Sequence, residues 1–156
     1  MIKLAYSTSG LTQLPFLYAL DAIAASGYEG VEISFHRDQF NPFSLSLADL
    51  DAVKERLSGN GIKPACVATA SHFFDPTRPH EPSLLALDQA ARQKRVDLIK
   101  RGLHVARYLG ANLVTFGSGF LRPEHVRAAD VDPFEIVADS IRECLREVRE
   151  GEDMTL

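Results

Sequence analysis

One segment of the chain reads Gly27-Tyr28-Glu29-Gly30-Val31-Glu32-Ile33-Ser34-Phe35, a turn followed by a mostly apolar run. Polar and apolar residues do not alternate strictly in this run, which is typical of strands that are buried on both faces of a sheet. Three more runs share this character, and they span residues 2–7, 63–68 and 112–116. Each run, including residues 30–35, predicts one strand.

Between these runs, apolar residues recur at the three- and four-residue steps of a helix with one buried face. The first stripe spans residues 16–24 and ends at Gly27. The second opens at Ser46, whose hydroxyl can cap the first turn together with Asp49. The third extends from about residue 83 to residue 109, and the fourth opens at Asp132-Pro133 and continues to Val148.

Alternating strands and helices are the signature of parallel βα units, so we expect an α/β fold. After Gly151, the register of the units predicts the start of a fifth strand in residues 152–156. A closed barrel of eight such units needs about 250 residues, whereas these 156 residues hold four units. We therefore expect a single domain, residues 1–156, that forms half of a TIM-type barrel with its helices outside. Because the open sheet leaves its edges unpaired, we expect either a truncation at strand five or assembly with a second chain.

The composition is that of an ordinary globular domain, with 46% hydrophobic and 24% charged residues. The formal net charge of −4 provides no basic surface for nucleic acid or an anionic membrane. Cys66 and Cys144 are the two cysteines, which indicates reduced thiols in a cytosolic protein. The N-terminal residues do not resemble a leader, and no run of 18 apolar residues occurs. The sequence thus predicts a cytoplasmic protein without nucleic-acid or membrane partners.

Three segments carry a resemblance to a known family, and they are residues 27–33, 65–72 and 108–119. They read Gly-Tyr-Glu-Gly-Val-Glu-Ile, Ala-Cys-Val-Ala-Thr-Ala-Ser-His and Tyr-Leu-Gly-Ala-Asn-Leu-Val-Thr-Phe-Gly-Ser-Gly. In these segments the chain resembles the N-terminal half of the xylose isomerase-like TIM-barrel family of sugar phosphate isomerases and epimerases.

The resemblance implies that a divalent cation (Mn, Mg, Co or Zn) polarises a keto or hydroxy group while carboxylates move a proton through an enediolate. It also implies that a sugar, keto-sugar or sugar phosphate binds at the C-terminal ends of the strands. The family's metal ligands come from strands five to eight, so we expect them beyond Leu156 and expect no metal on this chain alone. We accordingly expect the complete protein to be an enzyme and the 156-residue chain by itself to be inactive.

We assign six residues to the substrate side of the half-barrel, and they are Tyr6, Glu32, His36, His72, Phe73 and Ser118. None of them is assigned a catalytic step. Glu32 lies inside a buried run, where a carboxylate is costly unless it is paired. It either binds a sugar hydroxyl, orients a catalytic group, or takes part in a structural ion pair. His36 and His72 follow the second and third strands, where an imidazole can contact a sugar hydroxyl or a metal, or cap the backbone of a loop.

The other candidates also lie at strand ends. Tyr6 ends the first strand, and Ser118 lies between two glycines that let backbone amides approach a phosphate or sugar, or that simply form a tight turn. Phe73 begins a loop over residues 73–82 that either covers a substrate or packs on a neighbouring loop. Relatives that act in DNA repair have a histidine after the fourth strand, and residues 116–118 contain none, which disfavours an endonuclease.

Basic residues gather in the third helical stripe. Helical periodicity puts Lys100, Arg101 and Arg107 opposite the apolar side, on a solvated face. Arg92 and Arg95 fall near the apolar side, where we expect them to snorkel or to pair with an acid of the neighbouring unit.

Two hypotheses for function remain. The first is a metal-dependent sugar or sugar phosphate isomerase or epimerase, expected to form a homo-oligomer, to which this chain supplies the N-terminal half. The second is a non-catalytic half-barrel module that assembles with itself or with a partner through its open edges.

Overall fold

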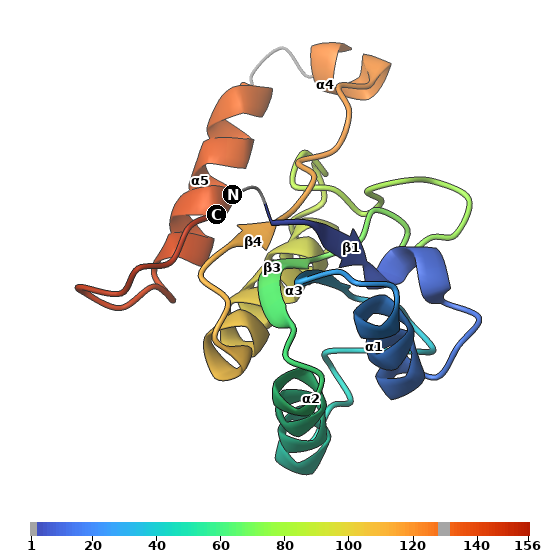
Figure 1. The fold of residues 1–156 in the computed structure, drawn as a ribbon. Coiled ribbons are helices and arrows are strands. Elements are labelled where there is room, and N and C mark those ends of the chain that lie inside the picture. Colours follow the sequence, from blue (N-terminus) through green and yellow to red (C-terminus); the bar gives the residue numbers. More distant parts are fainter. Residues whose placement is uncertain (1–2, 128–131) are drawn as a thin grey trace.

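The computed structural model describes residues 3–127 and 132–156. At its centre is a parallel sheet with the strand order β1-β2-β3-β4 (Figure 1). The strands are β1 (Ala5–Ser7), β2 (Gly30–Ser34), β3 (Lys63–Ala68) and β4 (Val114–Thr115). The main helices are α1 (Phe16–Ala25), α2 (Leu47–Gly59), α3 (Gln89–Leu109) and α5 (Pro133–Leu145). Two short helices, η1 (Thr8–Leu11) and α4 (Pro123–Arg127), are not predicted by the sequence pattern.

The core lies between the strands and the helices that surround them on the outside (Figure 1). Val31, Ile33 and Val67 are completely buried and belong to one cluster with apolar side chains of the helices. Those helical side chains include Leu20, Ile23, Val53, Leu57, Leu98 and Leu103. Because successive strand residues point to opposite faces, Glu32 and Ser34 project from the other face of β2. The predicted α/β architecture of a partial barrel with outer helices is confirmed.

The predicted helix caps are present. Ser46 forms a capping box in which its Oγ accepts from the amide of Asp49 at 3.2 Å and Asp49 accepts from the amide of Ser46 at 2.8 Å. Asp132 accepts from the amide of Phe134 at 2.8 Å at the start of α5. Gly110 ends α3 with a φ of 83°, a left-handed conformation that glycine adopts without strain.

An isolated bridge forms where the sequence predicts the start of a fifth strand. Thr155 forms a parallel bridge with Leu113 beside β4. Its amide donates to the Asn112 carbonyl at 2.8 Å, and its carbonyl accepts from the Val114 amide at 2.9 Å. The C-terminal residues therefore continue the parallel sheet at the β4 edge.

Some predicted boundaries are wrong. The third helix begins at Gln89 instead of residue 83, because Asp88 caps the amide of Ala91 at 2.6 Å and the preceding residues form turns. In those turns Leu84 is fully buried, and its amide donates to the Ser118 carbonyl at 3.1 Å. The apolar residues that extend the helical pattern before Gln89 therefore lie in the connection to α3 and anchor that connection in the core. The fourth helix ends at Leu145, and β4 is shorter than residues 112–116. Of the predicted first strand, β1 forms only Ala5–Ser7, and residue 2 lies outside the described residues.

Two expectations about the basic residues of α3 are also wrong. Lys100 and Arg107 are not simply solvated, because Lys100 contacts Glu143 at 2.7 Å and Arg107 donates to Glu152 at 2.8 Å. Arg95 neither snorkels nor pairs with an acid. It is completely buried and donates to backbone carbonyls instead. None of the helices in residues 3–127 and 132–156 combines the length and apolar character that a membrane span needs.

Candidate functional site

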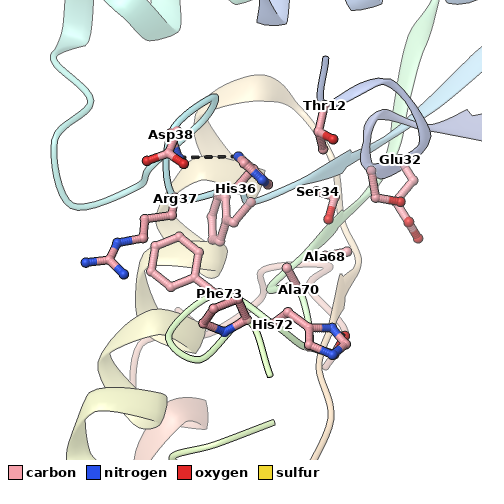
Figure 2. Close-up of a pocket in the computed structure, with 14 residues that line it drawn as sticks. Thr12, Glu32, Ser34, His36, Arg37, Asp38, Ala68, Ala70, His72 and Phe73 are labelled. Atoms are coloured by element: carbon pink, nitrogen blue, oxygen red, sulfur yellow. Dashed lines mark hydrogen bonds between the residues drawn. The ribbon is translucent and has the colours of Figure 1, made fainter. Parts of the chain in front are cut away.

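A cavity of about 620 Å³ opens at the C-terminal ends of β2 and β3. Its lining includes Glu32, Ser34, His36, Ser71, His72 and Phe73. Figure 2 shows the two imidazoles on opposite sides of this pocket, with Ser34, Ala68 and Ala70 between them. Parallel strands bring their C-terminal ends to the same edge, and ligands of βα barrels bind there. We call this cavity the strand-end pocket.

Glu32 lies on β2 opposite Cys66 of β3. Its Oε2 accepts from the Cys66 thiol at an Oε2 to Sγ distance of 3.4 Å. Burial, and then the hydrogen bond and negative charge of Glu32, raises the pKa of Cys66 to about 12. Within the described residues Glu32 forms no ion pair. The carboxylate is half-buried and lines the pocket, so it can accept hydrogen bonds from a bound hydroxyl.

His36 is held by the backbone that follows β2. Its Nδ1 accepts from the amide of Asp38 at 3.3 Å, as the dashed line in Figure 2 shows. Its backbone forms an antiparallel bridge with Phe40 through hydrogen bonds of 3.1 and 3.0 Å. A neutral imidazole that accepts at Nδ1 carries its proton on Nε2. His36 therefore both caps a backbone amide and has Nε2 as a donor.

His72 and Phe73 enter the pocket from the connection after β3. His72 is exposed, and its Nδ1 lies 2.9 Å from the Ser71 hydroxyl. Phe73 is buried and packs edge-to-face on Phe74, with ring centroids 5.0 Å apart. It also lies near Phe43, at a centroid distance of 6.0 Å. Phe73 thus packs on its neighbours and forms an apolar wall of the pocket at the same time.

Several residues that line the pocket are not among those predicted from the sequence, and Ser34 is one of them. Ser34 lines the pocket, and its amide donates to the Oγ1 of the fully buried Thr8 at 2.9 Å. This bond joins the start of η1, directly after β1, to the end of β2. The spacing of two residues between Glu32 and Ser34 is a signal that could have identified Ser34, because it puts both on one face of a strand.

Tyr6 lies away from the strand-end pocket. In the strand register Tyr6 pairs with Val31, whereas Ser7 pairs with Glu32. Its ring packs on Tyr28 at a centroid distance of 5.3 Å, in a separate cavity beside α1. A shift of one residue along a strand changes the face to which a side chain points, and Tyr6 therefore points toward the helices.

Ser118 also lies away from this pocket, in an apolar cavity beside α5. The glycines around it permit close packing with the connection after β3. A Cβ at Gly117 would overlap the His80 ring, and a Cβ at Gly119, which has a φ of 105°, would overlap Ser83. The structure therefore gives the two glycines a packing role, and it does not bring Ser118 together with Glu32.

The described residues do not offer a ligand set for a metal ion. In the ranges 3–127 and 132–156, no group of three or more His, Cys, Asp or Glu side chains comes together as a metal site would require. Glu32, His36 and His72 line one pocket, but they do not converge on a common point in this way. Their arrangement instead suits hydrogen bonding to a polar ligand.

Comparisons with known proteins support this fold. A model of the xylose isomerase-like TIM barrel family matches residues 20–155. A solved D-tagatose 3-epimerase-like protein has a TM-score of 0.74 at 14% identity, covering 98% of this chain and 51% of that one. An AP endonuclease, family 2, from Brucella melitensis has a TM-score of 0.67 at 17% identity, with coverages of 99% and 54%. A D-psicose 3-epimerase solved with D-fructose has a TM-score of 0.66 at 15% identity, with coverages of 96% and 49%.

The chain spans about half the length of these solved structures. Identities this low establish similarity of fold. No curated protein matches the sequence significantly.

Proposed function

The chain belongs to the xylose isomerase-like TIM barrel family, whose model it matches over residues 20–155, and we propose on this premise that the complete protein is a sugar isomerase or epimerase. This chain supplies the N-terminal half of the barrel and one side of the substrate site. The reaction moves a proton between a carbon atom of the substrate and a base of the enzyme. The substrate is a sugar, a keto-sugar or a sugar phosphate.

The strand-end pocket is the observation that carries this proposal. Its volume of about 620 Å³ lies within the roughly 300–1,000 Å³ of small-molecule sites. Sugar hydroxyls need both acceptors and donors, and the pocket provides the Glu32 carboxylate as an acceptor and the His36 imidazole as a donor. Phe73 adds an apolar wall against which the carbon face of a sugar can pack.

The solved structures support the substrate class. Those that resemble the chain include a D-psicose 3-epimerase and an L-ribulose 3-epimerase. An AP endonuclease is also among them, but the net charge of −4 gives the chain no electrostatic attraction for DNA. We therefore propose a sugar and not a nucleic acid as the ligand.

We propose that the divalent metal implied by the family is held by residues of the complete protein beyond Leu156, because the side chains in the ranges 3–127 and 132–156 do not fit such an ion. The role of Glu32, His36 and His72 is then to hold substrate hydroxyls in position. We also propose a cytoplasmic location, in which the free thiols of Cys66 and Cys144 stay reduced.

The test uses the complete protein with D-fructose, D-psicose, D-tagatose and L-ribulose in D₂O, and NMR detects deuterium incorporated next to the carbonyl. Glu32→Gln keeps the shape of the side chain and removes its charge, and we expect turnover to fall by at least about tenfold. Glu29→Gln is the matched control, since Glu29 is an exposed carboxylate of the same segment. Absence of deuterium from all four ketoses, and from their phosphate esters tested in the same way, contradicts the proposed activity. Unchanged turnover in Glu32→Gln, with loss of thermal stability only, contradicts the role of Glu32.

A second candidate, a non-catalytic module that assembles with a second copy of itself, is favoured by an apolar surface at α5. Phe134, Leu121 and Phe120 are 75%, 57% and 52% exposed, and they line a largely apolar cavity of about 470 Å³. Large exposed apolar patches mark interaction sites. Two copies would also supply the eight strands of a closed barrel.

Native mass spectrometry of the 156-residue chain tests this candidate. Assembly predicts a species at twice 17.2 kDa that Phe134→Glu dissociates. A monomer of 17.2 kDa at high concentration contradicts it.

A further inference from the structure

Arg95 is the largest of the completely buried side chains in the described structure. It lies on α3, away from the pocket lining, and its function is not explained by the proposed sugar contacts. Burial lowers its pKa to about 10, so the guanidinium still carries its charge at neutral pH. A buried charge is unfavourable unless the protein solvates it, and the groups that do so here are specific.

The partners of Arg95 are two backbone carbonyls at the two ends of one connection. Its Nε donates to the Pro82 carbonyl at 3.0 Å, and its Nη1 donates to the Ala70 carbonyl at 3.2 Å. The guanidinium carbon also lies 5.3 Å from the centre of the Phe74 ring. The residues between these carbonyls form part of the long connection from β3 to α3 (Figure 1), and we call them the 70–82 loop. Arg95 joins the two ends of this loop.

The 70–82 loop carries the pocket residues His72 and Phe73. Two of its residues, Ala70 and His80, have φ values of 55° and 62°. Residues other than glycine adopt such φ values only at an energetic cost, which contacts with the surrounding structure must offset. The amide of His80 donates to the Ser71 carbonyl at 2.6 Å, which is a further bond across the base of the loop. The loop conformation thus depends on contacts at its base.

We propose that Arg95 is a positioning residue, which fixes the base of the 70–82 loop and thereby determines the positions of His72 and Phe73 in the strand-end pocket. This inference rests on the proposed function only in that the pocket is the substrate site. Arginine suits the role because its planar fork directs several N–H groups at once to diverging acceptors, whereas lysine presents a single point charge. Glu81, the nearby acid, is already paired with Arg122 at 2.6 Å.

The first test is hydrogen–deuterium exchange of the complete protein, followed by mass spectrometry. Arg95→Met replaces the arginine by an apolar side chain of similar length, and we expect exchange in the 70–82 loop to rise about tenfold. Exchange in β2 and α2 should stay unchanged. Arg95→Lys should give an intermediate rate, because lysine keeps the charge but cannot bond both carbonyls. Arg101→Met is the control, since Arg101 is exposed on the same helix.

The second test separates positioning from general support of the fold. In Arg95→Met we expect kcat/KM for the ketose substrate to fall about tenfold, mainly through KM, and Arg95→Lys to recover part of the loss. The NMR signals of the His72 imidazole should shift in Arg95→Met and stay in place in Arg101→Met. If Arg95→Met does not fold, the same measurements on Arg95→Lys decide the question.

The outcomes separate this inference from the proposed function. If a folded Arg95→Met protein has wild-type exchange rates in the 70–82 loop, the positioning role of Arg95 is overturned. The role is also overturned if exchange in the loop rises while the His72 signals and KM stay unchanged. If the wild-type protein converts none of the ketoses and none of their phosphate esters, the proposed function fails. The loop exchange and the His72 signals then still decide whether Arg95 positions the pocket.

Discussion

Glu32 and Cys66 lie opposite each other on neighbouring strands, and Glu32 helps to raise the pKa of the Cys66 thiol. Their contact puts a thiol against a carboxylate on the inner face of the sheet. Deprotonation of Cys66 would create a second negative charge in a buried position, and for this reason its pKa lies at about 12. Cys66 is therefore a hydrogen-bond donor to Glu32 and a poor nucleophile at neutral pH.

Alkylation rates test this pairing. At pH 8 we expect iodoacetamide to modify Cys66 at least about a hundredfold more slowly than free cysteine, because so little thiolate is present. Glu32→Gln removes the negative charge and should accelerate Cys66 alkylation about three- to tenfold. Cys144 is the internal control, since burial is the main cause that raises its pKa to about 12, and its rate should not respond to Glu32→Gln. Equal Cys66 rates in both proteins would contradict the pairing. Mass spectrometry of the two cysteine peptides measures all of these rates.

At the scale of elements, α3 is the helix that connects several parts of the half-barrel. It packs on β3 and β4 and carries Arg95, which reaches the connection after β3. Gly102 makes this close approach possible. A Cβ at Gly102 would lie 3.1 Å from Cγ1 of Val114, the first residue of β4, and 3.3 Å from Cγ2 of Thr69, the residue after β3. Both are tight contacts.

A larger residue at this position should therefore loosen the contact between helix and sheet. We expect Gly102→Val to lower the free energy of unfolding by about 1–3 kcal/mol through overpacking, as measured by urea denaturation. The matched control is Gly59→Val at the end of α2, where no heavy atom lies within 4 Å of the Cβ position. It should change stability by less than about 0.5 kcal/mol. Equal effects of the two substitutions would show that Gly102 does not set the distance between α3 and the sheet.

At the scale of the whole molecule, ion pairs fasten the last part of the chain to the centre. Arg107 of α3 donates to the Glu152 carboxylate at 2.8 Å and to the Glu147 carbonyl at 2.8 Å. The Arg107 guanidinium and the Arg149 amide together lower the pKa of Glu152 from 4.5 to about 2. These contacts hold in place the segment that leads to Thr155, and Thr155 forms the bridge with Leu113 beside β4.

Arg107→Met should release this segment. Because the folded pKa of Glu152 lies below the unfolded value, its ionised form stabilises the fold above pH 4.5, and this contribution is lost as the pH falls toward 2. We therefore expect Arg107→Met to have a lower Tm than the wild type at pH 7, and the gap to narrow progressively below pH 4.5. Arg146→Met, at an exposed position after α5, should leave the Tm unchanged. A gap that stays constant with pH would rule out the carboxylate as its source.

The sequence by itself determined the alternation of strands and helices, the caps at Ser46 and Asp132, and the start of a fifth strand near Thr155. These features follow from periodicity and from hydrogen bonds between residues close in the chain, which are encoded locally. The same reasoning assigned Glu32, His36, His72 and Phe73 to the substrate side, and these four residues line one pocket. They lie on or just after a predicted strand, and parallel strands bring their ends to one edge of the sheet.

Only the tertiary structure decided the other features. Tyr6 lies on the helix side because the register between β1 and β2 pairs it with Val31. Ser118 lies in another cavity because its neighbouring glycines accommodate His80 and Ser83. Arg95 spans the base of a loop whose two carbonyls meet only after folding. In each case the deciding contact joins segments that are far apart in the chain. Local propensity therefore cannot predict the contact, because it depends on side-chain packing and strand register.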